Sequence, residues 1–566
     1  MNKQTRKKLG DLLVEVGMIT REQLEKCLEI QKTTGEKIGE ILIANNYVTQ
    51  QDIIQVLEFQ LGIPHVNLDK YEIDPATCLI IPENLARRYG LIPIRKENGI
   101  LTVAMSDPMN VFAIDDVQIY SGMEVQPVIA SLSSITKAID RYYGTQKAMQ
   151  AVEEFKKELG SSLRITSETA DEQSEDEINN APAVKLVNSI IEQAVRSRAS
   201  DIHIEPFEQY VKIRYRIDGQ LYEAMRTEVE VMPAIAARIK IIGGMNIAEK
   251  RLPQDGRISV QIDDRDLDLR VSILPTVFGE KIVIRIADKK AFIISKDKLG
   301  FNSEDREKFE SMLLNPHGII LVTGPTGSGK TTTLYSAINE INRPGINLVT
   351  IEDPVECLIE GVNQMQVNYK IGLTFASGLR SIVRQDPDVI MLGEIRDAET
   401  AEIAVRAAVT GHLVLSTLHT NDAPGSVIRL IDMGIEPFMV ASAVVGVIAQ
   451  RLVRKICENC RKEYTASEEQ LEILGCQRTD RITLYKGSGC PVCNGTGYLG
   501  RVGVYEIMPV TRKHRELIRK RCSEDELREL STMSGMRTLR ENVRDAVLKG
   551  VTTVDELIRI SYSNDY

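Results

Sequence analysis

The stretch ILVTGPTGSGKTTTLYSA, residues 320–337, decides the fold of this chain. An apolar strand pattern breaks into glycines, reaches Lys330 and three threonines, and continues as a helical pattern. This is the G-x-x-x-x-G-K-[ST] pattern of a phosphate-binding loop, in the strand-to-helix context that such a loop needs, so a glycine-rich turn without a ligand is the weaker interpretation. The residues expected to bind the nucleotide are Gly324, Pro325, Thr326, Gly327, Ser328, Gly329, Lys330, Thr331 and Thr332.

Each residue type in this loop has a physical role in binding ATP. Glycines let backbone N–H groups approach the phosphates closely, and the N-terminus of the following helix favours an anion. Lys330 supplies a positive charge to the outer phosphates, and the Thr331 hydroxyl is placed to hold Mg²⁺. The loop therefore predicts ATP and Mg²⁺ as cofactors.

Buried strand patterns alternate with helical patterns from about residue 300, which predicts a parallel sheet with crossover helices. Two of these strands end in acidic residues: Glu352 follows NLVTI, and Glu394 closes DVIMLGE as the acid of a Walker B element does. His412 and His419 flank another strand, LVLSTL. Because ATP hydrolysis needs a carboxylate that orders the metal and a group that orients the attacking water, we expect these side chains near the phosphates.

Length, composition and charge limit the remaining possibilities. A chain of 566 residues is too long for one hydrophobic core, so about three or four domains are expected. The net charge of −10 and the lack of a basic, aromatic-laced stripe disfavour nucleic acid as a partner and a DNA-translocating ATPase as the function. The apolar, uncharged run Pro437 to Gln450 has 14 residues, fewer than the about 20 that span a bilayer. No signal peptide is visible, so we expect a cytoplasmic protein that reaches a membrane only through partners.

The N-terminal region, residues 1–145, contains a tandem repeat with a period of 29 residues. Residues 8–31 align with residues 37–60, and most apolar positions of one copy meet apolar positions of the other. In each copy a threonine stands three residues before Gln or Asp, as at a helix start. Each copy is therefore predicted to be a small helical unit, and short strand and helix patterns over residues 71–143 complete the domain.

Two further regions precede the ATPase domain. Residues 146–180 are polar and rich in acidic side chains, which predicts a flexible linker. Residues 181–295 show alternating strand patterns around the turn Asp218-Gly219, which predicts an α+β domain that contains a β-hairpin. The ATPase domain is expected over residues 296–566, with helices after about residue 510.

Four of the nine cysteines form two C-x-x-C pairs, Cys457 with Cys460 and Cys490 with Cys493. Two such pairs in a cytoplasmic protein suit a tetrahedral zinc site, which predicts a structural zinc-binding excursion over residues 455–497. The 29 residues between the pairs exceed the about 15–20 of a simple zinc ribbon. A redox dithiol is the alternative, although neither pair opens a thioredoxin-like βαβ unit.

Five motifs follow one another along the chain, and together they resemble a known family. They are ASDIHIEP, GPTGSGKTTT, TIEDPVE, GLRSIVRQDPDVIMLGEIRD and TGHLVLSTLHTNDA. Over residues 181–566 the chain resembles the secretion ATPases that drive type II secretion and type IV pilus assembly. The resemblance implies an α/β fold, in which a RecA-like P-loop ATPase domain follows a PAS-like α+β domain and works as a homohexamer. The N-terminal helical repeat domain and the small zinc-binding excursion complete the expected architecture.

The resemblance also implies roles for single residues in the ATPase domain. Glu352 becomes the candidate general base, and Glu394 becomes the Walker B acid that acts through Mg²⁺ and water. His419 becomes a sensor of the γ-phosphate. The resemblance also favours Zn²⁺ at the four cysteines.

Arginines before the ATPase domain match a further part of the family pattern. Arg270 and Arg285 match arginines that reach the nucleotide from the domain preceding the motor. Ion pairs on the strand face with nearby acids, such as Asp266 and Asp268, are the alternative. His203, in ASDIHIEP, matches the family signature without an assigned chemistry.

The cargo of such a motor follows from the resemblance alone. It implies that an inner-membrane platform protein, turned from the cytoplasmic side, moves filament subunits with the help of other cytoplasmic assembly components. Retraction motors of this family typically lack both the long N-terminal region and the cysteine quartet, so we expect pilus assembly, with type II secretion as the alternative. A non-hydrolysing scaffold or receptor is disfavoured, because Lys330, Thr331, Glu352 and Glu394 are all present.

The N-terminal repeat resembles the tandem motif with which the N-terminal domains of many pilus extension ATPases bind cyclic di-GMP. The residues implied by this resemblance are Lys8, Leu9, Gly10, Gln31, Lys37, Ile38, Gly39 and Gln60. Apolar side chains can flank the purines, and lysines can meet phosphates or guanine acceptors. Lys8 replaces the arginine usual in the first motif, and Asn46 stands where the first copy has Gly17. A helical adaptor that docks on a partner is the alternative.

Overall fold

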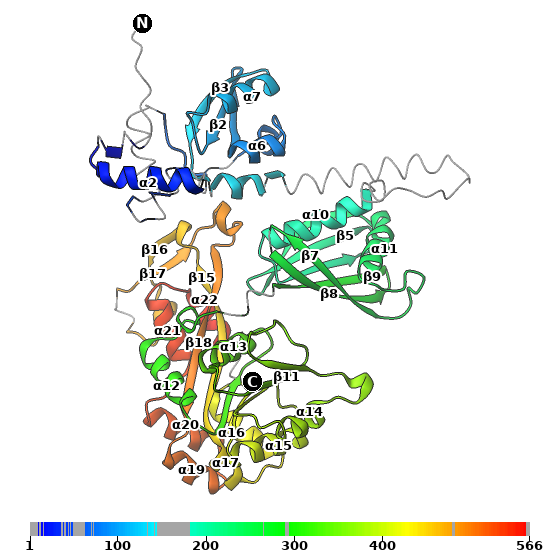
Figure 1. Cartoon of the computed structure of the whole chain (residues 1–566), viewed down its shortest axis with the longest axis vertical. Coiled ribbons are helices and arrows are strands. Elements are labelled where there is room, and N and C mark those ends of the chain that lie inside the picture. The colour runs from blue at the N-terminus through cyan, green and yellow to red at the C-terminus, as the bar shows by residue number, and fades with distance from the viewer. Residues whose placement is uncertain are drawn as a thin grey trace. The chain divides into compact units, whose positions relative to one another are not determined.

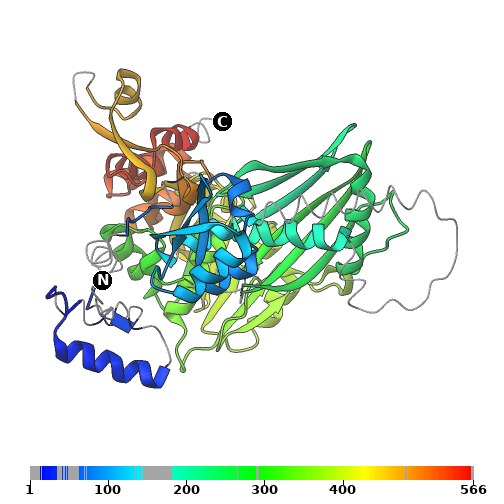
Figure 2. The ribbon, with the colours of Figure 1, turned by 90° about the horizontal axis from the view of Figure 1, so that it is seen from above.

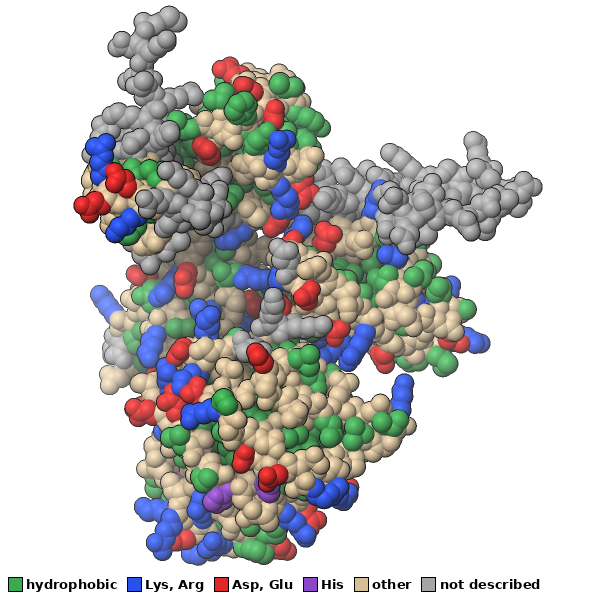
Figure 3. All heavy atoms as spheres, viewed as in Figure 1, with side chains coloured by type: hydrophobic (Ala, Val, Ile, Leu, Met, Phe, Trp, Pro, Cys, Tyr) green, Lys and Arg blue, Asp and Glu red, His purple; other side chains and the backbone are tan. Residues whose placement is uncertain are grey.

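The computed structural model describes residues 10–48 and 63–143, each with gaps, and residues 182–561 apart from 264, 289–291, 293 and 478–480. Its packing separates two compact units, the first formed mostly by residues 1–197 and the second mostly by residues 198–566. Figures 1 and 2 show the ribbon from two directions. On the face drawn in Figure 3, acidic and basic side chains are interspersed. The domain boundaries expected at residues 145, 180 and 295 stay predictions.

The second unit contains a seven-stranded sheet with the order β12-β11-β13-β14-β10-β15-β18. The strands are β10 (Gly318–Thr323), β11 (Leu348–Glu352), β12 (Asn363–Gln366), β13 (Val389–Leu392), β14 (Leu413–Leu418), β15 (Val444–Ile456) and β18 (Tyr498–Pro509). The strands from β12 to β15 in this order pair in parallel, and β15 pairs antiparallel with β18. The predicted parallel sheet is therefore confirmed, whereas the long ribbon of β15 and β18 was not expected from the sequence.

Helices cover both faces of this sheet, as its buried strands require. In β10, Ile319 and Leu321 join one hydrophobic cluster, whereas Ile320 and Val322 join another. The first cluster takes side chains from α14 (Phe375–Ile382), α15 (Ala398–Val409), α16 (Ala423–Asp432), α17 (Pro437–Ala443), α19 (Arg512–Arg519), α20 (Glu524–Met533) and α21 (Leu539–Leu548). The second takes them from α12 (Ser303–Leu313) and α13 (Lys330–Ile341), and α22 (Val554–Ser561) ends the described chain. The helices predicted after about residue 510 are confirmed.

A six-stranded antiparallel sheet, also in the second unit, has the order β6-β5-β4-β9-β8-β7. Its strands are β4 (Asp201–Pro206), β5 (Tyr210–Ile217), β6 (Gln220–Glu228), β7 (Gln254–Ile262), β8 (Arg265–Thr276) and β9 (Gly279–Asp288). In sequence, α10 (Pro182–Arg196) precedes β4 and α11 (Met232–Ile242) follows β6. The predicted hairpin joins β5 to β6, and its turn residues Asp218 and Gly219 have φ of 49° and 88°, as a type I′ turn requires.

The described N-terminal residues contain a helix and a small sheet. The predicted helix start at Thr20 is confirmed, because Thr20 N–H donates to Gln23 Oε1 at 2.8 Å and Gln23 N–H donates to Thr20 Oγ1 at 3.2 Å. The helix that follows is α2 (Arg21–Thr34). The corresponding start in the second copy, at Thr49, lies outside the described residues. Residues 63–143 contain β1 (Leu91–Glu97), β2 (Ile100–Met105), β3 (Glu124–Ile129), α5 (Pro75–Cys78), α6 (Glu83–Tyr89) and α7 (Val111–Ser121).

Candidate active site

The predicted phosphate-binding loop connects β10 to α13 at the carboxyl edge of the seven-stranded sheet. Thr323 ends β10, and Lys330 begins α13. Gly324 and Gly329 have positive φ, 148° and 89°. A Cβ atom at Gly324 would lie 2.5 Å from the Gln450 carbonyl oxygen, and one at Gly329 would lie 2.8 Å from Gln450 Nε2. The loop needs glycine at both positions, because β15 packs directly against it.

Polar groups of this loop are arranged to receive an anion. Lys330 Nζ donates to the carbonyl oxygens of Gly324 at 2.7 Å and Pro325 at 3.1 Å. Burial lowers the pKa of Lys330 to about 8, although the nearby charge of Glu394 acts in the opposite direction. Within the described residues, the buried Ser328 hydroxyl has no hydrogen-bond partner. A half-buried cation and an unpaired hydroxyl both gain from a bound phosphate, so the loop fits the nucleotide predicted for it.

Glu352, the candidate general base, ends β11 and is 3% exposed. Its carboxylate accepts a hydrogen bond from the Tyr335 hydroxyl, one from Thr350 Oγ1 at 2.6 Å and one from Gln364 Nε2 at 3.1 Å. Tyr335 belongs to α13, the helix that begins at Lys330. The phosphate-binding helix and the neighbouring strands β11 and β12 therefore fix the orientation of this carboxylate together.

Glu394 and His419 meet at the ends of two neighbouring strands, β13 and β14. His419 Nε2 lies 3.3 Å from Glu394 Oε2, and Arg396 Nη2 lies 2.6 Å from Glu394 Oε1. Burial raises the pKa of Glu394, but the hydrogen bond from Arg396, its charge and the contact with His419 outweigh burial and leave that pKa below its ordinary value. Glu394 is thus a carboxylate at neutral pH, as a group that orders Mg²⁺ must be.

His412 does not share this position. It stands before the first residue of β14, whereas His419 follows the last, and its Nδ1 lies 2.8 Å from the Ala407 carbonyl oxygen. The two histidines therefore lie at opposite ends of one strand. Because the functional edge of a parallel sheet is its carboxyl edge, the expectation that both belong to the site is wrong for His412.

Both predicted arginines form ion pairs in this structure. Arg270 donates to both carboxylate oxygens of Glu356, the second glutamate of TIEDPVE, with Nη1 at 3.3 Å from Oε1. Arg285 Nε lies 3.2 Å from Asp201 Oδ1. Arg270 Nε also lies 3.9 Å from Asp268 Oδ2, one of the acids considered in the sequence. The arrangement leaves the nucleotide-contacting role of both arginines a prediction.

The four predicted metal ligands lie together. The sulfur atoms of Cys457, Cys460, Cys490 and Cys493 are all within 4.8 Å of one another. A zinc–sulfur distance of about 2.3 Å places the sulfurs of a tetrahedral site about 3.8 Å apart, close to this arrangement. Four thiolates on two turns are a donor set that suits a structural metal ion, so the residues present fit the Zn²⁺ predicted for them.

The predicted cyclic di-GMP site is described in part. Gly10, Gln31 and Ile38 are described, whereas Lys8, Leu9, Lys37, Gly39 and Gln60 lie outside the described residues. A Cβ atom at Gly10 would lie 2.4 Å from Leu24 Cδ1 of α2. This packing gives Gly10 a structural reason to be glycine that needs no ligand, and the site stays a prediction.

Sequence reasoning missed three residues that shape the site. Gln450 lies against both loop glycines. Arg451 Nη2 donates at 3.1 Å to the carbonyl oxygen of Asn421, which stands two residues after His419. Tyr335 binds the candidate base. Only the run Pro437–Gln450 gave a signal, because it contains the buried first half of β15, and the polar Gln450 and Arg451 interrupt the apolar pattern in the middle of that strand.

Comparisons with known proteins agree with this geometry. The family described as Type II/IV secretion system protein matches residues 176–559, and the MshEN domain matches residues 61–149. The type IV pilus assembly ATPase PilB of Myxococcus xanthus is 43% identical over 97% of this chain and 98% of its own length. The type II secretion system protein E of Xanthomonas campestris is 43% identical over 88% of this chain and 89% of its own length.

These matches define the class of the protein. The chain belongs to the type II/IV secretion system protein family. The predicted resemblance and the predicted P-loop ATPase are both confirmed. Among solved structures, the ATPase DotB of Legionella pneumophila shares the fold, with a TM-score of 0.50 and 20% identity over 66% of this chain and 95% of its own. In the described part of the chain, no helix has the length and apolar character needed to cross a membrane.

Proposed function

We propose that this protein is the hexameric motor whose ATP hydrolysis drives polymerisation of type IV pilin through an inner-membrane platform protein. The observation that carries the proposal is the meeting of Glu394 and His419 beside the Lys330 loop, in a chain that aligns over 97% of its length with a pilus assembly ATPase. Such a motor works at the cytoplasmic face of the inner membrane, with other assembly components as partners.

Binding and metal ordering belong to one group of side chains. Lys330 contacts the outer phosphates when it exchanges its loop carbonyl partners for phosphate oxygens. The Thr331 hydroxyl and the Glu394 carboxylate would hold Mg²⁺, and the ion would supply positive charge to the phosphates. Glu394 is suited to this role because its pKa lies below the ordinary value.

Hydrolysis itself belongs to a second group. Glu352 orients and deprotonates the attacking water. To do so, one of its carboxylate oxygens gives up a hydrogen bond from the protein and accepts one from the water. His419 contacts the γ-phosphate. Arg270 and Arg285 supply positive charge to the transition state after leaving their carboxylate partners.

Deletion of the gene in its own organism tests the proposal. We expect loss of surface pili, restored by the wild-type chain but not by Glu394→Gln, with extracellular enzyme secretion unchanged. Loss of secretion with intact pili would instead support the second candidate, a type II secretion ATPase, which the 43% identity to protein E favours. A deletion that changes neither would contradict both functions.

Two ligands beyond the nucleotide complete the proposal. The four clustered cysteines bind Zn²⁺ in a structural role, a proposal supported by their sulfurs, which all lie within 4.8 Å of one another. The N-terminal domain binds cyclic di-GMP through its repeat, a proposal supported by the resemblance of the repeat; the MshEN domain matches residues 61–149, which directly follow the repeat. Calorimetry of the full chain with cyclic di-GMP tests it, with Gln31→Ala as the binding-deficient variant. No heat at micromolar concentration would favour the helical adaptor.

A further inference from the structure

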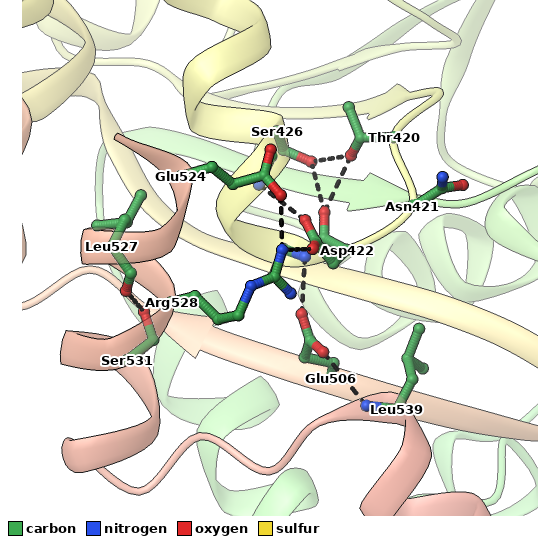
Figure 4. A network of polar contacts seen from close by, with 12 residues as sticks. Thr420, Asn421, Asp422, Ser426, Glu506, Glu524, Leu527, Arg528, Ser531 and Leu539 are labelled. Atoms are coloured by element: carbon green, nitrogen blue, oxygen red, sulfur yellow. Dashed lines mark hydrogen bonds and ion pairs between the residues drawn. The ribbon is translucent and has the colours of Figure 1, made fainter. Parts of the chain in front are cut away.

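A partly buried polar network ties the loop after His419 to the C-terminal helices (Figure 4). Asp422 is the N-cap of α16, and its Oδ1 accepts from the Gly425 N–H at 2.8 Å. Its other oxygen, Oδ2, lies 2.5 Å from Nη2 of Arg528, which belongs to α20. Arg528 also contacts Glu524 on its own helix at 2.6 Å. One end of the loop is therefore held by a side chain from the C-terminal helices.

The same loop is anchored at its other end to the phosphate-binding loop. The Thr420 N–H donates to Thr323 Oγ1 at 2.8 Å, and Thr323 is the residue directly before Gly324. The Thr420 hydroxyl donates to the Asp422 carbonyl oxygen at 3.0 Å. A continuous path of contacts therefore runs from Arg528 through Asp422 and Thr420 to the phosphate-binding loop.

His419 directly precedes these anchors, next to the end of β14, and its side chain is itself weakly held. Its side chain is half exposed, and its contact with Glu394 is 3.3 Å long. A side chain with so few contacts takes its position from the backbone of its loop. The anchors at Thr420 and Asp422 therefore decide where the imidazole points.

Charge balance makes Arg528 the vulnerable member of the network. Asp422 and Glu506 are 7% and 2% exposed, and both carboxylates lie close enough to Arg528 to interact with its charge. Glu506 Oε1 accepts a hydrogen bond at 2.8 Å from the N–H of Ala423, the residue directly after Asp422. Arg451, also buried, contributes a second cation from the side of Asn421. Removal of Arg528 leaves the buried Asp422 carboxylate without its ion pair, which favours a shift of the loop.

We propose that Arg528 is a positioning residue for ATP hydrolysis, which acts through Asp422 to hold His419 against the γ-phosphate. This inference rests on the role proposed for His419. It makes α20, far from the phosphate-binding loop in sequence, part of the hydrolytic machinery.

Steady-state ATPase assays on the full-length assembly test the inference. We expect Arg528→Ala to lower kcat about tenfold while KM for ATP changes less than twofold, because the phosphate-binding loop itself is intact. Arg528→Lys keeps a cation near Asp422 and should recover part of the loss. The control is Arg512→Ala, since Arg512 is exposed on the neighbouring α19 and pairs with Glu516 of the same helix.

A double-mutant cycle with His419→Ala separates positioning from general stability. If Arg528 acts through His419, Arg528→Ala adds less than twofold to the loss caused by His419→Ala. The inference would be overturned if the losses of kcat in the two single variants multiplied in the double variant, or if Arg528→Ala left kcat unchanged. If Arg528→Ala does not assemble, Arg528→Lys enters the same cycle. The wild-type chain should hydrolyse ATP whatever the variants do, so failure of the Arg528 inference can be told from failure of the proposed ATPase function.

Discussion

The nucleotide site and the cysteine cluster are held in place in different ways. The site residues stand at the ends of β10, β11, β13 and β14, and every residue of these four strands is buried. The cluster lies beside β16 (Arg461–Thr465) and β17 (Thr483–Gly487), a two-stranded sheet in which Leu484 is the one fully buried residue. A pair of strands is marginal alone, and Leu484 packs in a small cluster with side chains of α21 and α22. The first site takes its geometry from a fully buried sheet, whereas the second combines this small core with what the thiols bind.

The largest expected effect comes from a change in the site that spares its packing. Glu394→Gln removes a charge but keeps the shape of the side chain, so β13 stays in place. We expect kcat to fall about 10²–10³-fold, as when one charge-stabilising group is lost from an active site. ATP binding should remain within about threefold, which nucleotide titration measures beside phosphate release.

The matched control for this change is Glu402→Gln, because Glu402 is an exposed acid of α15 whose partner is Arg406 on the same helix. It should leave turnover unchanged. Equal turnover in Glu394→Gln and the wild type would remove Glu394 from the mechanism.

The two arginines are expected to show an intermediate effect. Arg270→Ala and Arg285→Ala should each lower kcat about tenfold without weakening ATP binding, because their charges reach the phosphates only after they leave Glu356 and Asp201. Arg226→Ala is the control, since Arg226 pairs with Glu223 within β6. If neither change slows turnover, the ion pairs seen here are the whole role of both residues.

A change in the cysteine cluster should disturb local structure more than turnover, the reverse of the changes in the nucleotide site. Cys490→Ser removes one of four thiolates, so bound zinc should fall from about one ion per chain to a small fraction, and amide exchange should rise over residues 450–500. Turnover should fall less than about threefold, because the seven-stranded sheet does not depend on the metal. Cys476→Ser is the control, a cysteine of the same excursion outside the cluster. Wild-type protein purified without chelator and free of zinc would contradict the site.

Local patterns predicted much of this molecule. The phosphate-binding loop was identified because its glycines, lysine and flanking elements are contiguous in sequence. The hairpin at Asp218-Gly219 was predicted because a type I′ turn needs residues that accept positive φ. The helix start at Thr20 follows from a capping box four residues long. In each case the determining contacts lie within a few residues.

The features that the sequence did not predict depend on contacts between residues far apart in the chain. The ribbon of β15 and β18 pairs strands separated by the cysteine excursion, and neither strand signals its partner. Gln450 matters because it packs against Gly324 and Gly329, more than a hundred residues earlier. His412 was misplaced because flanking a strand does not say which end faces the ligand. The ion pair between Arg270 and Glu356 likewise joins segments with no sequence relation.

The smallest effect concerns pH, and it should have opposite signs in the two regions. Burial raises the pKa of Glu506 to about 7, with the charge of Asp422 acting in the same direction and the Ala423 N–H, the Leu539 N–H and Arg528 opposing it. The folded chain therefore holds this proton more tightly than the unfolded chain. Its stabilising effect is complete below the ordinary pKa of glutamate and is lost as pH rises through about 7.

Between pH 5.5 and 7.5 this group should cost the ATPase domain about 2 kcal/mol of unfolding free energy. Denaturant unfolding of the wild type and Glu506→Gln at both pH values measures it, and the variant should lose most of this dependence, because Gln stays neutral. The cysteine cluster should respond the other way, since acid protonates thiolates and releases the metal, so amide exchange over residues 450–500 should rise as pH falls. Equal pH dependence in the two proteins would show that Glu506 is ionised throughout, its charge held by the two N–H donors and Arg528. The Glu506 carboxylate would then be a permanent anion stabilised by its donors, just as the thiolates of the cysteine cluster are stabilised by the metal.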